Sequence, residues 1–275
     1  MKRTRIMGIL NITPDSFSDG GCCTDPVAAA RRAAEIEAEG ADIIDIGPQS
    51  TRPGHIPLTA EEEIRRLSPV LEEAAGAGLR TPISIDTFFP ETADFALQRG
   101  ASIVNDVSGG VNPAMAEVVR KHGAAWILTH TGGQPDAADQ SRAYEPDVVT
   151  AVHAALEQMA AEAQALGIPK DKLILDPGIG FGKTRGDDLR LLLHGDAVKV
   201  AGIPLLVGAS RKRVVEYAAN LTVPEPLQRL GGTVALHIFA QMHGADILRV
   251  HDVRAAVQAA AVTDRLRKEV SSGSI

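Results

Sequence analysis

Residues 83–107 have the sequence ISIDTFFPETADFALQRGASIVNDV, and this stretch contains the pattern that decides the fold. Residues 83–87 and 102–107 are short runs rich in apolar, β-branched side chains, which are typical of buried strands. Residues 90–98 lie between them with helical spacing, and this segment starts with a proline and is soon followed by a glycine, as capped helices often are. The stretch therefore predicts a strand, a covering helix and a second, parallel strand.

The same unit repeats along the whole chain. Eight apolar runs are interpreted as strands, at residues 6–11, 42–47, 83–87, 102–107, 125–130, 173–176, 205–208 and 247–251. Predicted helices between them include residues 26–39, 60–77, 90–98, 113–121, 148–166 and 227–243. Eight parallel strands with covering helices close into a barrel, and 275 residues is a usual length for one such barrel. We therefore predict an α/β protein with a single (β/α)8 TIM-barrel domain over residues 1–275.

The composition argues against several classes of protein. Hydrophobic residues make up 44% of the chain and charged residues 23%, as in ordinary globular proteins. The formal net charge of −7 leaves no basic face to neutralise a nucleic-acid backbone, so we expect no nucleic-acid partner. No apolar run approaches the roughly 20 residues that span a bilayer, and residues 6–10 are too short for the core of a signal peptide. We expect a cytoplasmic protein with no membrane contact.

Some polar residues receive no chemical role. The two cysteines, Cys22 and Cys23, are adjacent, which fits neither a disulfide framework nor the spacing of zinc ligands. We interpret them as loop thiols, with a strained vicinal disulfide as the alternative. His130, His237 and His243 are interpreted as packing or helix-surface histidines.

Nearly every apolar run ends in a polar or ionisable residue, followed by a residue that favours turns. In a barrel the carboxyl ends of the strands meet at one rim, where barrel active sites are built. A single Asp or Asn after a strand can equally well cap the next helix, but capping does not require this whole set. We therefore predict one site, built from Leu10-Asn11, Asp45-Ile46-Gly47, Asp86-Thr87, Asn105-Asp106, His130-Thr131-Gly132, Asp176-Pro177-Gly178, Gly208-Ala209-Ser210 and Arg249-Val250-His251.

Seven segments of the chain resemble, in the same order, the signature segments of the dihydropteroate synthases. A single such segment would be a weak signal, but seven in sequence, each at a predicted strand end, are specific. They are LNITPDSFSDGG (10–21), DIGPQSTRPG (45–54), ISIDT (83–87), NDVSGG (105–110), LDPGIGFGKT (175–184), GASRK (208–212) and RVHDV (249–253). The resemblance covers essentially the whole chain.

The resemblance implies a transferase of folate biosynthesis. Members of that family condense 6-hydroxymethyl-7,8-dihydropterin pyrophosphate with 4-aminobenzoate, and the products are 7,8-dihydropteroate and pyrophosphate. The resemblance also implies a Mg²⁺ cofactor, a homodimer and inhibition by sulfonamides, which mimic the aminobenzoate.

The pterin-binding residues follow from this resemblance. A pterin has a flat 2-amino-4-oxo edge with adjacent N–H donors, and a carboxylate accepts two such donors in a fork. The resemblance implies that Asp176 binds this edge and that Asp86 and Asn105 bind other ring nitrogens. Lys212 would donate to the carbonyl side. The alternative for Asp86 and Asp176 is a structural ion pair with Lys212 or Arg249, because ion-pair networks also bury carboxylates.

A pyrophosphate leaving group needs cations and N–H donors where negative charge develops. Arg249 and His251 are two positions apart on a predicted strand, so they point the same way and can bind one phosphate together. The resemblance implies that Asn11 helps to coordinate a Mg²⁺ ion that bridges the two phosphates, and Mg²⁺ accepts such a sparse protein site. Asn11, Lys212, Arg249 and His251 are the predicted catalytic residues. The alternative for Arg249 and His251 is an ordinary surface strand end.

The aminobenzoate site is predicted mainly from loops. In the family this substrate lies under two loops, here residues 13–24 and 49–58, which are rich in Gly, Ser, Thr and Pro. The resemblance implies contacts with the aromatic ring or carboxylate from Phe17, Thr51, Arg52, Pro53, Phe181 and Ser210. Ordinary solvated loops are the alternative, as is a Phe181 that only fills the barrel mouth. An arylamine is unprotonated at neutral pH, so we expect no strong general base and mostly electrostatic catalysis.

Two segments depart from the family pattern. Pro48-Gln49 stands where Gly-Glu is usual, which puts in doubt the closure of the second loop and the sensitivity to sulfonamides. Residues 129–133 are only a loose version of a Met-His-Met segment.

Two other functions remain open: a domain that transfers methyl groups from a methylated tetrahydrofolate to a cobalamin, and a non-catalytic pterin-binding paralogue. The former would not need Arg249 and His251, and the latter would be expected to lose Asn11, Lys212 or Arg249.

Oligomerisation is predicted at the C-terminus. The alanine-rich residues 253–266 could present an apolar face to a second copy of the chain. The same face could instead cover the barrel.

Overall fold

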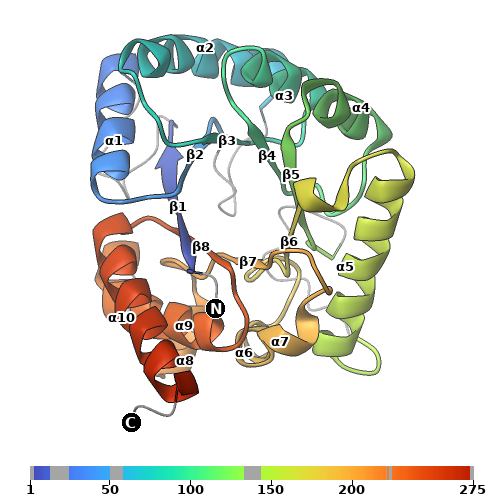
Figure 1. The fold of residues 1–275 in the computed structure, drawn as a ribbon, viewed down its shortest axis with the longest axis vertical. Helices are drawn as coiled ribbons and strands as arrows, with labels where there is room; N and C mark the ends of the chain where they lie inside the picture. The colour runs from blue at the N-terminus through green and yellow to red at the C-terminus, as the bar shows by residue number, and fades with distance from the viewer. Residues whose placement is uncertain are drawn as a thin grey trace.

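The computed structural model describes residues 3–12, 25–49, 58–132, 144–220, 222 and 225–272. Its strands form a ring that the helices surround (Figure 1). The eight strands are β1 (Arg5–Asn11), β2 (Ile43–Gly47), β3 (Ile83–Asp86), β4 (Ile103–Asp106), β5 (Ala125–Thr129), β6 (Leu173–Asp176), β7 (Leu206–Val207) and β8 (Ile247–Val250). Each predicted apolar run is therefore confirmed as a strand.

The helices follow the strands in sequence and cover the outside of the ring. They are α1 (Pro26–Ala38), α2 (Ala60–Gly76), α3 (Pro90–Leu97), α4 (Pro113–His122), α5 (Val148–Ala165), α6 (Arg185–Leu193), α7 (Gly195–Val198), α8 (Val214–Ala219), α9 (Leu230–Met242) and α10 (Val253–Ser272). Two short 3-10 helices, η2 (Lys170–Lys172) and η3 (Pro226–Arg229), precede β6 and α9. The prediction named no helix at α6, α7 or α8, and its last helix before β8 began too early, because η3 occupies that turn.

Hydrogen bonds close the strands into a barrel. All paired strands are parallel, in the order β6-β5-β4-β3-β2-β1-β8-β7. The two ends of this order meet at an isolated bridge between Leu175 in β6 and Leu205, next to β7. There, the Leu175 N–H donates to the Pro204 carbonyl oxygen over 3.0 Å. The predicted (β/α)8 barrel is thus confirmed, with a short seventh strand.

Local sequence signals begin and end the helices as capping rules expect. Asp25 accepts a hydrogen bond from the Val27 N–H at the start of α1, where Pro26 takes the first helical position. Thr184 and Asp187 form a reciprocal capping box at the start of α6. These signals fix where each strand's carboxyl end stops and its helix begins, and so they shape the rim.

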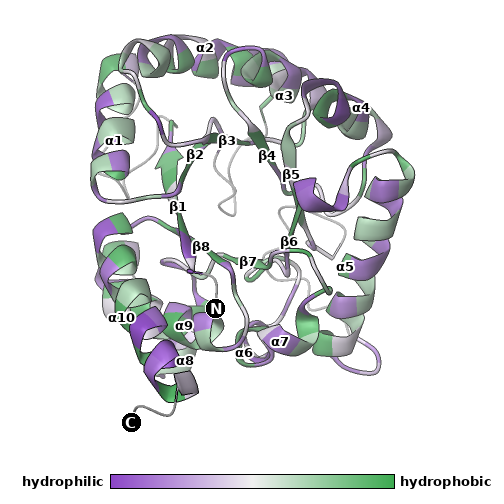
Figure 2. Cartoon of the chain, in the orientation of Figure 1, coloured by the Kyte–Doolittle hydropathy of each residue, from purple (hydrophilic) through white to green (hydrophobic). Residues whose placement is uncertain are grey.

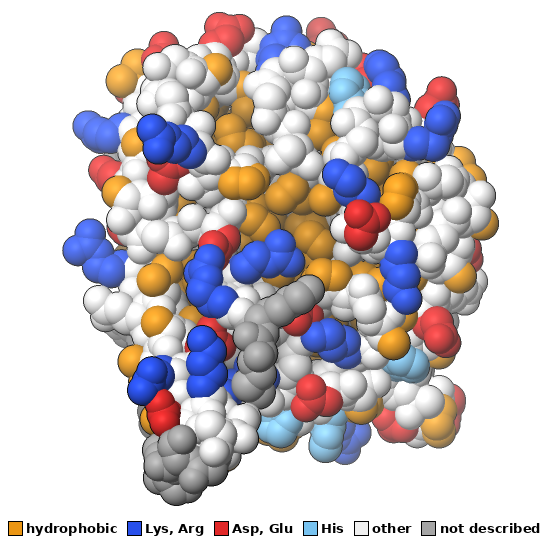
Figure 3. All heavy atoms as spheres, viewed as in Figure 1, with side chains coloured by type: hydrophobic (Ala, Val, Ile, Leu, Met, Phe, Trp, Pro, Cys, Tyr) orange, Lys and Arg blue, Asp and Glu red, His pale blue; other side chains and the backbone are white. Residues whose placement is uncertain are grey.

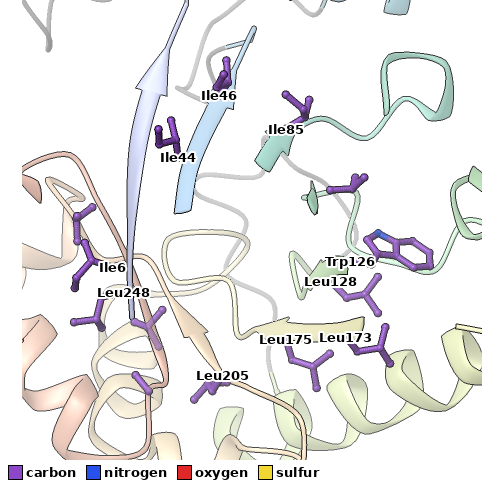
Figure 4. Close-up of a cluster of buried hydrophobic side chains, with 14 of the residues drawn as sticks. Ile6, Ile44, Ile46, Ile85, Trp126, Leu128, Leu173, Leu175, Leu205 and Leu248 are labelled. Atoms are coloured by element: carbon purple, nitrogen blue, oxygen red, sulfur yellow. The ribbon is translucent and has the colours of Figure 1, made fainter. Parts of the chain in front are cut away.

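Apolar side chains form two layers, one on each side of the strand ring. The inner layer contains no helix residue, takes one residue from each of seven strands, and fills the barrel: Met7, Ile43, Ile103, Ile127, Ile174, Leu206 and Ile247, each at most 8% exposed. The outer layer lies between strands and helices, and Figure 4 shows part of it, including Ile44, Trp126 and Leu248. Each large side chain buried in this way stabilises the fold by about 1.5–3 kcal/mol.

Hydropathy and charge follow this layering. The strands are mostly hydrophobic and the helices carry hydrophilic residues outward (Figure 2). On the face that Figure 3 shows, apolar side chains gather over the middle of the barrel and charged side chains lie around them. None of the helices in the described part of the chain is long and apolar enough to cross a membrane.

Candidate active site

The polar side chains at the carboxyl ends of the strands point into the barrel. Alternate residues of a strand face the same side, so a residue two positions after the inner apolar layer points inward as well. Four of the strand-end residues stand at that position: Asp45, Asn105, Asp176 and Arg249. Asp86 is aligned with Asn105 in the sheet register and joins this set. A polar layer therefore lies directly on the apolar filling of the barrel.

Arg249 is the centre of a buried network of four strands. Its Nε donates to Asp45 Oδ2 over 2.7 Å, and its Nη2 donates to Asp86 Oδ2 over 2.6 Å. Asn105 Nδ2 donates to the same Asp45 oxygen over 3.1 Å. Asp86 therefore pairs with Arg249, as the ion-pair interpretation of the sequence expected, and this pair lies inside the site.

The network holds two carboxylates, Asp45 and Asp86, against one guanidinium. The pKa of Asp86 is raised to about 7, mainly by burial; Arg249 opposes this shift, and the negative charges of Asp45 and Glu63 contribute to it. Asp45 is fully buried, and among the described residues its Oδ1 has no hydrogen-bond partner. The network thus contains a buried carboxylate oxygen that a donor on a bound ligand could satisfy.

Asp45→Asn should lower the pKa of Asp86 from about 7 toward its ordinary range, because it removes a like charge from the network. A ¹³C NMR titration of the aspartate carboxyl groups measures this shift. Glu63→Gln is the matched control, since it removes a second acid with a smaller effect on Asp86 and should lower the pKa less. An unchanged or higher Asp86 pKa in the Asp45→Asn protein would contradict this account of the network.

Asp176 and Lys212 form the second part of the site. Asp176 is 8% exposed, and its Oδ1 accepts a hydrogen bond of 2.7 Å from the Gly178 N–H. Lys212 Nζ donates to the Ile179 carbonyl oxygen over 2.5 Å and lies 4.9 Å from the centre of the Phe181 ring. Burial lowers the pKa of Lys212 to about 8, and the charge of Asp176 is the largest effect that opposes it. The charges of Asp176 and Lys212 therefore stabilise each other at this end of the barrel.

Other predicted residues lie at the same rim. Ser210 Oγ accepts a hydrogen bond from the His251 N–H over 3.2 Å and lies 3.0 Å from His251 Nδ1. Asn11 ends β1 beside Gly47, where an added Cβ atom would come within 3.4 Å of Asn11 Oδ1. The absence of a side chain at Gly47 leaves room for the Asn11 amide at the rim.

The structure therefore brings the predicted pterin and pyrophosphate residues to one end of one barrel. Phe181 lies beside Lys212, which is compatible with either of its predicted roles. Phe17, Thr51, Arg52 and Pro53, together with Cys22 and Cys23, lie outside the described residues.

The packing interpretation of His237 is confirmed. The side chain is 3% exposed, and its Nε2 accepts a hydrogen bond from the Ala209 N–H over 3.2 Å. Burial lowers the pKa of His237 to about 4, so the ring is neutral and holds the end of β7 in place. His243 stacks on Phe239, at a centroid distance of 6.5 Å.

Two buried residues at the rim had no predicted role. Asp45 belonged to the strand-end pattern but received no function, although it accepts hydrogen bonds from both Arg249 and Asn105. Lys183 stood in a matching segment, yet nothing in its spacing indicated that it is 4% exposed. The strand-end position was the available signal for Asp45, whereas Lys183 is explained only by the folded loop.

Fold and site together define a class: a (β/α)8-barrel enzyme with buried acidic and amide groups at the carboxyl ends of its strands and cations beside them. The model of the family described as "Pterin binding enzyme" matches residues 7–251. Dihydropteroate synthase of Mycobacterium leprae (strain TN) is 42% identical over 263 residues, which is 93% of this chain and 90% of that protein. The chain belongs to the dihydropteroate synthases, within the pterin-binding enzyme family.

Solved structures agree with this assignment. The crystal structure of the Yersinia pestis dihydropteroate synthase with a sulfonamide drug matches with a TM-score of 0.88 at 38% identity, and the match covers 97% of this chain and 94% of that one. Dihydropteroate synthase from Xanthomonas albilineans in complex with 7,8-dihydropteroate matches with a TM-score of 0.84 at 38% identity, with 97% and 94% covered.

Proposed function

We propose that the protein condenses 6-hydroxymethyl-7,8-dihydropterin pyrophosphate with 4-aminobenzoate to give 7,8-dihydropteroate and pyrophosphate. The observation that carries this proposal is the convergence of Asp176 and Lys212 with Arg249, His251 and Asn11 at one barrel end. The membership of the family and the relatives' names support the same reaction.

Asp176 is suited to bind the pterin edge. One of its carboxylate oxygens is held by the Gly178 N–H, so the group is fixed in orientation while the other oxygen remains an acceptor. Asp86 and Asn105 would form hydrogen bonds with other ring nitrogens. Lys212 would give up its hydrogen bond to the Ile179 carbonyl oxygen and donate to the pterin carbonyl instead. The burial of these groups strengthens each such hydrogen bond, because little water competes with it.

Arg249 is suited to bind the pyrophosphate. Its Nε and Nη2 are used by Asp45 and Asp86, whereas its Nη1 makes no hydrogen bond to the described residues. The two acids therefore fix the plane of the guanidinium and leave one edge for a phosphate oxygen. His251, held by Ser210, would add a second donor at this rim.

The residues present fit a Mg²⁺ ion that is shared with the substrate. In the described part of the chain, no three His, Cys, Asp or Glu side chains are arranged to hold a metal ion. Mg²⁺ commonly takes most of its ligands from phosphate oxygens and water, so the single amide oxygen of Asn11 suffices as a protein ligand. When bound, the ion would neutralise charge on the leaving pyrophosphate.

The chemistry needs little proton transfer from the protein. The pterin methylene C–O bond breaks first, and the bonding pair leaves with the pyrophosphate toward Arg249, His251 and Asn11. The aminobenzoate nitrogen then forms the new C–N bond and loses one proton. Positively charged and N–H groups placed where negative charge accumulates stabilise this transition state, which makes the catalysis mainly electrostatic.

Release of pyrophosphate tests the reaction. Purified protein with the pterin pyrophosphate and Mg²⁺ should release pyrophosphate rapidly when 4-aminobenzoate is present and only slowly without it. Chelation of Mg²⁺ by EDTA should lower the rate by about 100-fold or more, because several kcal/mol of charge stabilisation are lost. Readdition of Mg²⁺ is the control. Methyl transfer to a cobalamin, or no amine-dependent release at all, would contradict the proposal.

We infer that the protein acts as a homodimer in the cytoplasm. Large apolar side chains are exposed on α9 and α10, including Phe239 at 48%, Met242 at 54%, Val262 at 60% and Leu266 at 54%. Such a cluster favours association with a second copy of the chain. Light scattering of a Val262→Lys and Leu266→Lys double variant tests this surface. The double variant should be monomeric.

The sequence departs from its family at Pro48 and Gln49, where the second predicted aminobenzoate loop begins, and this segment bears on the proposed sulfonamide sensitivity. The Pro48 carbonyl oxygen accepts a hydrogen bond of 3.2 Å from Arg66, and Gln49 Oε1 accepts one of 3.1 Å from the Leu58 N–H. Pro48 and Gln49 are therefore each held by a hydrogen bond. We propose that sulfonamides still compete with 4-aminobenzoate here.

A further inference from the structure

Lys183 has an unusual environment next to the pterin site. It follows the β6 strand end in the loop that precedes α6, and it is 4% exposed. Its Nζ donates to three backbone carbonyl oxygens: His130 and Gly178 at 3.0 Å each, and Phe181 at 3.1 Å. An ammonium group has three N–H donors, so these acceptors satisfy all of them.

The positive charge of Lys183 is buried without a direct ion pair to any described residue. Burial lowers the pKa of Lys183 to about 8, and the charges of Asp188 and Asp176 only partly oppose this. Burying a cation in this way is costly unless its donors are fully used. A neutral side chain of the same length would fill this space at lower cost, so the ammonium group is explained by the carbonyl groups it gathers.

Those carbonyl groups belong to two different strand ends. His130 follows β5, and its N–H donates to the Asp176 carbonyl oxygen over 2.9 Å. Gly178 and Phe181 belong to the loop after β6. A Cβ atom on Gly178 would lie 1.9 Å from the His130 carbonyl oxygen, so the two segments are in direct backbone contact. Lys183 therefore joins the ends of β5 and β6 where their backbones are in contact.

The loop that Lys183 holds contacts both Asp176 and Lys212, the proposed pterin ligands. The Gly178 N–H fixes Asp176 Oδ1, the Ile179 carbonyl oxygen accepts from Lys212, and the Phe181 ring lies beside the Lys212 ammonium. The Gly180 N–H is also bound, by Asp188 Oδ1 over 2.7 Å. Movement of this loop would therefore shift Asp176 and Lys212 together.

We propose that Lys183 is a positioning residue of the pterin site, which holds the loop of residues 177–182 in place through its three carbonyl acceptors and so fixes Asp176 and Lys212. The inference rests on the proposed function only for the identity of the ligand. The held loop is a property of the ligand-free protein.

The test compares Lys183→Met, which keeps the apolar stem and removes the donors, with Lys183→Gln, which keeps one amide donor group. Hydrogen exchange of the peptide that contains residues 174–184 reports on the loop, and titration with 6-hydroxymethylpterin reports on the site. Lys183→Met should speed exchange in this peptide and weaken pterin binding on the order of 100-fold, because the hydrogen bonds that Asp176 and Lys212 form with the ligand would both be misaligned. Lys183→Gln should lie between this variant and the native protein.

Lys199→Met is the control away from the rim. Lys199 Nζ also donates to a backbone carbonyl, of Gly244, over 3.1 Å, and it pairs with Asp246 over 2.7 Å, but it lies before β8 rather than after a strand end. Its pterin affinity should stay within about 2-fold of native.

Lys183 variants that bind the pterin as the native protein does would overturn the proposal, and so would weaker binding without faster loop exchange. If Lys183→Met does not fold, the Lys183→Gln comparison decides by the same criteria. Native protein that binds no pterin would refute the proposed function instead, and the exchange measurement would still test the loop.

Discussion

Asp176→Asn should weaken binding of the pterin substrate on the order of 1000-fold, because it removes two charge-assisted hydrogen bonds from a buried site. The amide has nearly the same shape as the carboxylate, so the Gly178 N–H can keep its acceptor. The amide nitrogen, however, would face the N–H donors of the pterin. Isothermal titration with the pterin pyrophosphate, in the absence of 4-aminobenzoate, measures this loss.

Asp106→Asn provides the control for this prediction. Asp106 is also a buried acid at a strand end, but it accepts hydrogen bonds from Ser108 and Trp126 and belongs to the outward side of β4. The Asp106→Asn variant should differ from the native protein in its free energy of unfolding, but its pterin affinity should stay within about 2-fold of native. Near-native pterin affinity in Asp176→Asn would show that another group binds the 2-amino-4-oxo edge.

Arg249→Met should have two large effects that can be separated. The change leaves the Asp45 and Asp86 carboxylates buried without their cation, which should destabilise the protein by about 3–5 kcal/mol. It also removes a donor to the leaving pyrophosphate, which should lower turnover on the order of 1000-fold. Denaturant unfolding and single-turnover pyrophosphate release measure the two effects.

The stability loss in Arg249→Met should depend on pH. Arg249 lowers the pKa of Asp86, so its removal raises that pKa above about 7. A carboxyl group whose folded pKa exceeds its unfolded value binds its proton more tightly when folded. Its stabilising effect is therefore present at low pH and is lost as the pH rises through the folded pKa. The variant should thus be closest to native stability near pH 5 and furthest from it near pH 8.

The Arg249→Met and Asp45→Asn double variant is the control. It removes one surplus carboxylate and should recover part of the lost stability, but no turnover. Native-like turnover in Arg249→Met would mean that the guanidinium serves only the ion-pair network. A stability loss independent of pH would mean that Asp86 does not titrate as described.

The fold and the location of the site could be predicted from sequence because both depend on short-range patterns. Period-two alternation decides which side of a strand each residue faces, and barrel closure brings all carboxyl ends to one rim. Asp86, Asn105, Asp176 and Arg249 could therefore be assigned to one pocket without coordinates. Most of the capped helices were predictable for the same local reason. The helix α6 was missed although it begins with a capping box, and the short α7 and α8 give too few residues for a period to be recognised.

The pairing inside the pocket could not be predicted in this way. Whether Arg249 contacts Asp45, Asp86 or Asp176 depends on the stagger of strands far apart in sequence, which no local pattern encodes. The burial of Lys183 depends on how closely the His130 carbonyl approaches Gly178, which is a property of two loops in contact. Such details require the three-dimensional arrangement, and they determine protonation and positioning rather than the choice of fold.

The most direct test of the account is a crystal structure of the protein with 6-hydroxymethylpterin, pyrophosphate and Mg²⁺ bound together. The account predicts the pterin edge on Asp176 beside Lys212, and the pyrophosphate on Arg249 Nη1, His251 and a Mg²⁺ ion held by Asn11, all in one pocket. A pterin bound outside the barrel rim, or a pyrophosphate that contacts neither Arg249 nor His251, would contradict it.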